Sequence, residues 1–138
     1  MPSVKIIVAG GREFSDWNLL FKTIKETLQE LFDNGYKKEQ ISFVSGTARG
    51  ADSMGEFFAN TYRYKVYRFP AKWDELGKKA GFVRNSEMAK FASAADIGIL
   101  IVFWNGKSRG TKHMIETAEK CGLKIVLKHY ETEDITNE

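Results

Sequence analysis

The feature that most constrains this chain is a regular alternation of short apolar runs, rich in β-branched residues, with longer segments of helical periodicity. Five runs have strand character, at residues 4–9, 41–45, 66–69, 96–103 and 124–128. Between the first two, Leu20, Ile24, Leu28 and Leu31 recur at helical spacing. Connections of this length join parallel strands. We therefore expect an α/β fold, a Rossmann-like three-layer α/β/α sandwich on a five-stranded parallel sheet of order 3-2-1-4-5.

The length of 138 residues predicts one domain, at residues 1–129, followed by an acidic flexible tail at 130–138. The longest uninterrupted apolar run, Ile99–Trp104, has six residues and is too short to cross a membrane. A single cysteine, Cys121, excludes an internal disulfide and a cysteine-cluster metal site. We expect a cytoplasmic protein with no metal, no cofactor and no membrane partner.

The charge is distributed unevenly along the chain. The net charge is +3, but residues 131–138 contain four acids and no base, so the remaining residues carry 21 bases against 14 acids. This excess suits an anionic ligand. The bases form no concentrated stripe of the kind that nucleic-acid binding usually needs, so a nucleic-acid partner is not expected. Solvated helix faces remain the alternative explanation for most of the lysines.

Four loops that follow predicted strands contain both glycine and arginine, at residues 10–14, 45–52, 70–85 and 105–111. In a doubly wound sheet, ligands bind beyond the carboxyl ends of the strands, where these loops meet. Glycine and a helix N-terminus offer backbone amides to an anion, and guanidinium matches phosphate. The loops predict a phosphorylated ligand, held where Gly10-Gly11 faces Gly110-Thr111. The candidate ligand-binding residues are Gly10, Gly11, Arg12, Gly46, Arg49, Asp52, Trp73, Arg84, Asn85, Ser108, Arg109, Gly110 and Thr111.

Several of these residues also have a structural interpretation. Asp52 and Thr111 could be helix caps, and Trp73 could either stack on a base or cover the core. The polar segment at 72–80 is expected to be irregular and, with the helix that follows it to residue 85, to close over the ligand as a lid. Phe57, Phe58 and Tyr62 belong to the core or to the face of a homodimer or higher homo-oligomer.

Five motifs occur in order along the chain: Gly-Gly-Arg-Glu-Phe at 10–14, Gly-Thr-Ala-Arg-Gly-Ala-Asp at 46–52, Phe-Pro-Ala-Lys-Trp at 69–73, Ala-Gly-Phe-Val-Arg-Asn at 80–85, and Ser-Arg-Gly-Thr at 108–111. Together they resemble the YspA-like branch of the SLOG superfamily, which groups DprA-type DNA-processing proteins with LOG-type nucleotide phosphoribohydrolases. The resemblance implies a Rossmann-like fold that binds nucleotides or nucleotide-derived ligands at these loops.

The resemblance also bears on catalysis. Enzymatic LOG proteins pair an arginine before the fourth strand with a glutamate just after a Pro-Gly-Gly-x-Gly-Thr loop. Arg84 resembles that arginine, but the next carboxylate after Thr111 is Glu116, five residues on rather than two or three. Glu116 also stands four residues from both Lys112 and Lys120, which is typical of surface ion pairs. Arg84 and Glu116 are the catalytic candidates, and the departure from the pattern favours binding over hydrolysis.

Three functional hypotheses follow. The leading one is a sensor or sequestering domain for a nucleotide or an ADP-ribose-like ligand. The alternative is a nucleoside 5′-monophosphate phosphoribohydrolase, with Glu116, Asp52 or Glu13 as the carboxylate. The third is a single-stranded DNA-binding protein, which would need exposed aromatic residues beside a basic groove, whereas the aromatic residues mostly fall at core spacing.

Overall fold

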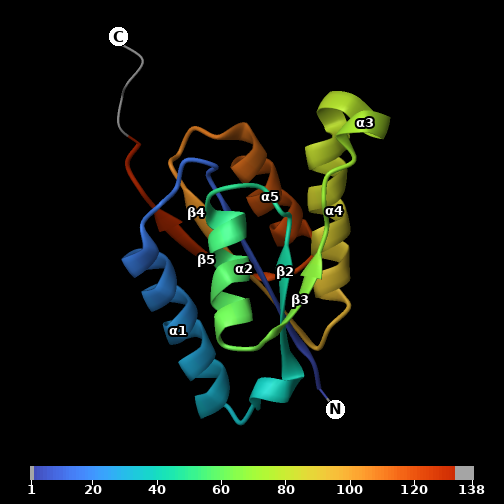
Figure 1. The fold of residues 1–138 in the computed structure, drawn as a ribbon. Coiled ribbons are helices and arrows are strands. Elements are labelled where there is room, and N and C mark those ends of the chain that lie inside the picture. Colours follow the sequence, from blue (N-terminus) through green and yellow to red (C-terminus); the bar gives the residue numbers. More distant parts are fainter. Residues whose placement is uncertain (1, 133–138) are drawn as a thin grey trace.

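A five-stranded parallel sheet of order β3-β2-β1-β4-β5 runs through the centre of the computed structural model, which describes residues 2–132 (Figure 1). The strands are β1 Val4–Gly10, β2 Ile41–Ser45, β3 Lys65–Arg68, β4 Ile97–Trp104 and β5 Lys124–His129. Each neighbouring pair is parallel. The predicted fold class and strand order are therefore confirmed.

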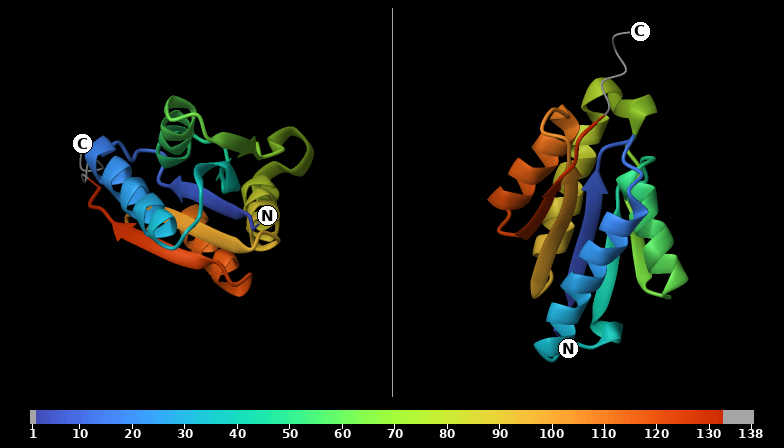
Figure 2. Two further views of the ribbon diagram at one scale, coloured as in Figure 1. Left: turned by 90° about the horizontal axis from the view of Figure 1, so that it is seen from below. Right: turned by 90° about the vertical axis from the view of Figure 1, so that its left-hand side faces the viewer.

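Helices cover both faces of the sheet, which makes the three layers visible in Figure 2. The helices are α1 Trp17–Asp33, α2 Ala51–Thr61, α3 Trp73–Leu76, α4 Ala80–Ser93 and α5 Arg109–Lys120, with short 3-10 turns at Lys38–Gln40 and Gly77–Lys79. Helices α1 and α2 pack on one face, and α4 and α5 on the other. The short helix α3 lies beyond the carboxyl ends of the strands (Figure 1).

The central strands divide their side chains between two cores. On β1, Val4, Ile6 and Val8 pack with α1 and α2, whereas Ile7 and Ala9 pack with α4 and α5. Because successive side chains of a strand point to opposite faces, a strand covered on both sides is apolar at every position. This explains the continuous apolar run in β4 and leaves the carboxyl ends of β1 and β4 as the place where polar loops meet.

Three local expectations are wrong. The segment at 72–80 is helical, since it contains α3 and the turn Gly77–Lys79. Asp52 does not cap α2, because the helix begins at Ala51 with Gly50 at the cap position. Thr111 does not cap α5, because Ser108 is the cap residue and its side chain accepts a hydrogen bond from the amide of Thr111. In both helices the cap residue comes earlier in the chain than predicted, and therefore nearer to the end of the preceding strand.

The aromatic residues of α2 separate into two groups. Phe58 is buried against Phe43 and Phe21, whereas Phe57 is 56% exposed and Tyr62 is also exposed. A homodimer or higher homo-oligomer that uses this face of α2 stays a prediction.

Tyr130 belongs to the packed structure, although the expected tail begins at this residue. Its hydroxyl donates a hydrogen bond to Oε1 of Glu13 at 2.5 Å, and its ring meets Phe14 edge-on at 4.9 Å. The later part of the expected acidic tail, 133–138, lies outside the described residues. None of the helices between residues 2 and 132 combines the length and apolar character needed to cross a bilayer.

Candidate functional site

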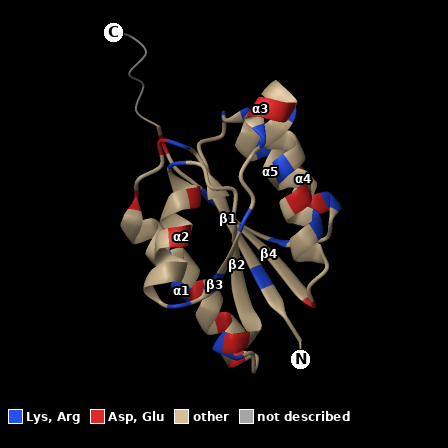
Figure 3. Ribbon diagram, turned by 45° about the vertical axis from the view of Figure 1, so that its right-hand side comes forward, with Lys and Arg blue, Asp and Glu red and all other residues tan. Residues whose placement is uncertain are grey.

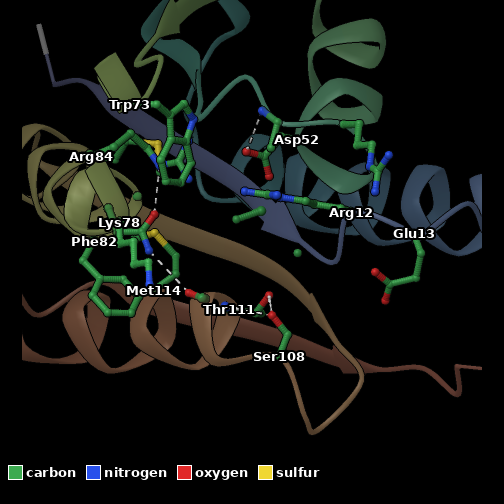
Figure 4. A pocket seen from close by; sticks show the side chains of 18 residues that line it. Arg12, Glu13, Asp52, Trp73, Lys78, Phe82, Arg84, Ser108, Thr111 and Met114 are labelled. Atoms are coloured by element: carbon green, nitrogen blue, oxygen red, sulfur yellow. Dashed lines mark hydrogen bonds between the residues drawn. The ribbon is translucent and has the colours of Figure 1, made fainter. Parts of the chain in front are cut away.

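A cavity of about 380 Å³ opens at the carboxyl ends of β1 and β4 (Figure 4). Residues from all four predicted loops line it. Those among the predicted ligand-binding residues are Gly10, Arg12, Arg49, Asp52, Trp73, Arg84, Asn85, Ser108, Gly110 and Thr111. The structure therefore places most of the predicted set, including Gly10, Gly110 and Thr111, around one space.

The other predicted residues lie outside this cavity. Gly46 lines a neighbouring space of about 710 Å³, which is bounded by several of the same residues, among them Arg12 and Arg84. Gly11 is buried, and its amide donates to the carbonyl of Phe103 at 3.2 Å. Arg109 and Glu116 are exposed on α5, away from the cavity lining.

The cavity is electropositive. Four basic side chains line it, from Arg12, Arg49, Lys78 and Arg84, against the two carboxylates of Glu13 and Asp52. Figure 3 shows lysine and arginine positions in the loops at this end of the sheet. No group of three His, Cys, Asp or Glu side chains within residues 2–132 is arranged to hold a metal ion. The charge favours an anion as the group bound directly by the protein.

Arg84 links two of the loops as well as facing the cavity. Its Nη1 donates to the carbonyl of Gly46, and its Nε donates to Oδ1 of Asn85 at 3.0 Å. The Nδ2 of Asn85 lies 3.3 Å from the carbonyl of Gly110 and 3.2 Å from Nδ1 of His113. Asn85 is itself buried. Arg84 and Asn85 therefore fix the β2–α2 loop relative to the start of α5.

Asp52 is the buried one of the two carboxyl groups in the cavity wall. It is 5% exposed, and its Oδ2 accepts a hydrogen bond from the amide of Ala48 at 3.3 Å. Burial raises the pKa of Asp52 to about 6, although the positive charge of Arg84 and the Ala48 hydrogen bond act in the opposite direction. Burial in turn lowers the pKa of Arg84.

The N-terminus of α5 presents hydrogen-bond donors to the cavity. The Ser108 hydroxyl accepts from the Thr111 amide at 3.3 Å and donates to the Thr111 hydroxyl at 3.1 Å. The amides of Arg109 and Gly110 donate to no other residue in the described part of the chain. Unsatisfied amides in the first turn of a helix bind anions, because they add hydrogen bonds to the helix dipole.

Phe82 is a cavity residue that the sequence analysis missed. It lines the cavity, is 45% exposed and stacks on His113 with ring centroids 4.3 Å apart. Burial lowers the pKa of His113, and Nδ1 of its ring lies 3.2 Å from the amide nitrogen of Asn85. The signal that could have identified Phe82 was its large apolar side chain on a face of α4 that does not pack against the core.

Comparison with known proteins assigns the chain to a family. The family model described as "YspA, cpYpsA-related SLOG family" matches residues 4–75, which is more than half of the chain. The chain belongs to this family. The Gene 61 protein of Mycobacterium phage D29 is 28% identical to this SLOG chain over 127 residues, covering 88% of the chain and 94% of the phage protein.

The fold of this SLOG chain is also similar to a solved structure. DNA processing protein A (DprA) from Streptococcus pneumoniae matches with a TM-score of 0.63 and 18% sequence identity. The match covers 89% of this chain and 49% of DprA, so the chain spans about half the length of that protein. At this identity the likeness establishes the Rossmann-like fold. Membership of the SLOG family links the chain to nucleotide-related binding or processing.

Proposed function

We propose that this SLOG chain binds a nucleotide or a nucleotide-derived, ADP-ribose-like phosphorylated ligand, as a sensor or sequestering domain. The observation that supports this function is the convergence of Arg12, Arg49, Arg84 and the N-terminus of α5 on one cavity. The cavity volume of about 380 Å³ lies within the range typical of small-molecule sites.

The proposed binding mode uses each wall differently. A phosphate lies between Gly10 and the first amides of α5, where Thr111 adds a hydroxyl and Arg12 and Arg84 add positive charge. Trp73 is 48% exposed and lies beside Arg12, whose guanidinium carbon is 5.9 Å from the ring centroid. Its ring offers a face for a base, and residues 72–85 form the proposed lid.

The test is calorimetric titration of the protein with pyrophosphate and with adenosine 5′-monophosphate at low salt. Arg84→Ala is expected to weaken both affinities by roughly 10- to 100-fold, because a hydrogen bond to a charged group is lost. Lys90 is exposed on the same helix, outside the cavity, so Lys90→Ala is the matched control. Arg109→Ala should cost less than Arg84→Ala, since Arg109 lies outside the cavity lining. An unaltered protein that binds neither compound would refute the proposal.

Hydrolysis of a nucleoside monophosphate is the second candidate, and Asp52 is the observation that favours it. A buried carboxyl group with a pKa of about 6 is suited to acid-base chemistry near neutral pH. Asp52 lines the cavity, whereas Glu116 does not, so Asp52 is the better carboxylate candidate. Release of adenine from adenosine 5′-monophosphate, abolished by Asp52→Asn, would establish this activity in place of simple binding.

A further inference from the structure

Asp52 does not fit a cavity that recognises anions alone. It projects from the first turn of α2 into a wall that also contains Arg12 and Arg84, and it is 5% exposed. A phosphate placed against an ionised carboxylate would be repelled at short range. A ligand that fills this cavity must therefore present a hydrogen-bond donor, rather than an anion, to Asp52.

The hydrogen bonds around Asp52 leave it able to accept such a donor. Oδ2 accepts from the Ala48 amide, while Arg84 donates to Gly46 and Asn85 instead. No ion pair joins Asp52 to a base, and no donor to its Oδ1 is found, among residues 2–132. Since no buried side-chain oxygen in this range is left without a partner, Oδ1 must reach the cavity surface rather than lie sealed in the core.

Gly46 lets the Asp52 carboxylate lie near the Arg84 guanidinium. A Cβ atom at position 46 would lie 2.7 Å from both Nη1 of Arg84 and Oδ2 of Asp52. Because Gly46 has no side chain, the Arg84 guanidinium and the Asp52 carboxylate can both lie against its backbone. The cavity consequently offers a cation and an acceptor close to each other, which suits a ligand with a phosphate and a neutral donor only a few bonds apart.

In nucleotides the neutral donors are the sugar hydroxyls and the amino and ring N–H groups of the base. Asp52 is buried, whereas the two aromatic faces that could contact a base, Trp73 and Phe82, are 48% and 45% exposed at the rim. The sugar, which lies between phosphate and base, is the part that reaches the depth of Asp52. With a pKa of about 6, the carboxyl group is mostly ionised at pH 7 and acts as an acceptor.

We infer that Asp52 accepts a hydrogen bond from a sugar hydroxyl of the ligand, so that this site selects phosphorylated ribose derivatives over other phosphate compounds. The inference rests on the proposed nucleotide-binding function and narrows it to ligands that retain their ribose hydroxyls. In this arrangement Arg12 and Arg84 bind the anion, and Asp52 distinguishes a nucleotide from inorganic phosphate or pyrophosphate.

The experiment compares three probes by calorimetry: adenosine 5′-monophosphate, its 2′,3′-dideoxy analogue and pyrophosphate. The unaltered protein is expected to bind the ribonucleotide about 10-fold or more tightly than the dideoxy analogue, because the analogue cannot make the hydrogen bond to the charged Asp52 carboxylate. Asp52→Asn should reduce ribonucleotide affinity by a similar factor. It should leave pyrophosphate affinity unchanged or higher, because a negative charge is removed. Glu119→Gln, which removes a charge from the exposed face of α5, is the control and should change none of the three.

The outcomes separate this inference from the function on which it rests. Pyrophosphate binding combined with equal affinity for the two nucleotides overturns the role of Asp52 and leaves the anion site intact. An equal loss for all three probes in Asp52→Asn also overturns it, because the residue would then act only through the structure of the site. Failure of the unaltered protein to bind any probe removes both proposals. The comparison of the two nucleotides on the unaltered protein does not depend on how the variant folds.

Discussion

The β2–α2 loop at residues 46–50 borders the same cavity as the β4–α5 loop at 105–108 and the first turn of α5. Gly50 in the first region and Gly110 in the second have opposite roles. Gly50 has a φ of +79°, and a Cβ atom there would lie 2.2 Å from the carbonyl oxygen of Gly11. At Gly110 a Cβ atom would meet nothing within 4 Å. Glycine in the first loop lets backbone pack on backbone, whereas glycine in the second leaves space beside helix amides. Gly50 thus serves backbone packing, whereas Gly110 leaves the start of α5 accessible.

The β2–α2 loop is also held in an uncommon conformation by its neighbours. Thr47 has a φ of +66°, which costs a non-glycine residue about 1–3 kcal/mol. Its amide donates to the Ser45 hydroxyl at 3.0 Å, and that hydroxyl donates to Glu56 at 2.6 Å. The Gly46 carbonyl accepts from Arg84. These bonds hold the loop in this conformation without help from any other molecule.

The largest expected effect is on Gly50. Gly50→Ala should lower the free energy of unfolding by about 2–5 kcal/mol, because it combines a left-handed φ with a close approach to the Gly11 backbone. Gly110→Ala is the matched control and should change stability by less than about 1 kcal/mol, in the stabilising direction expected for alanine in a helix. Urea unfolding of both variants measures the difference, and equal losses would remove the distinction between the loops.

A smaller effect, opposite in direction, is expected for Asp52→Asn. The pKa of Asp52 is raised from 3.8 to about 6 in the folded protein. Between about pH 4 and pH 6 the folded state therefore keeps a proton that the unfolded chain has lost, and this group lowers the free energy of unfolding as pH rises. At pH 7 the penalty is up to about 3 kcal/mol. Asparagine can still accept from Ala48.

The variant should consequently be more stable than the unaltered protein at pH 7, with the difference disappearing below about pH 4. Urea unfolding at several pH values between 4 and 7 measures this, with Glu119→Gln as the control. A difference that stays constant over that range would show that the ionisation of Asp52 does not oppose folding. The gain would mean that the β2–α2 side of the cavity retains a carboxylate at a cost to stability.

The smallest effect concerns the cap of α5. Ser108→Ala should reduce the free energy of unfolding by about 0.5–2 kcal/mol, because the Thr111 amide loses its acceptor. Ser108→Asp restores a cap but places a negative charge beside the proposed anion site. Urea unfolding should show that Ser108→Asp is as stable as the unaltered protein. Calorimetry should show that it binds pyrophosphate more weakly. If Ser108→Asp bound pyrophosphate as well as the unaltered protein, the β4–α5 loop would not be the anion-binding side.

The sequence predicted the sheet well because burial on both faces produces an unmistakable apolar pattern. The bounds Ile41–Ser45 agree with the prediction, and the strand order followed from the alternation of strands and helices. Sequence position alone did not decide the local roles of Asp52 and Thr111. Whether an oxygen caps a helix depends on which residue adopts the cap conformation, and Gly50 and Ser108 do so here.

The gathering of glycine and arginine loops predicted where the cavity lies, but not how its walls are held. Arg84 reaches the Gly46 carbonyl across 38 residues, and no local pattern encodes that contact. The stacking of Phe82 on His113 joins two helices and was likewise invisible in a single stretch of sequence. Contacts of this kind arise from tertiary packing, which periodicity does not report.

The hydrogen bond between Tyr130 and Glu13 has a consequence for the order in which the site is completed during synthesis. The two residues are 117 positions apart, and the Tyr130 hydroxyl lies where a side chain at Gly11 would otherwise project. A ribosome adds about 5–20 residues per second. Glu13 is therefore synthesised several seconds before Tyr130. The loop that supplies Gly10 and Arg12 therefore gains this support only when the last strand has been made and docked. The wall of the cavity that contains Gly10 and Arg12 would therefore be completed later than β1 and β2.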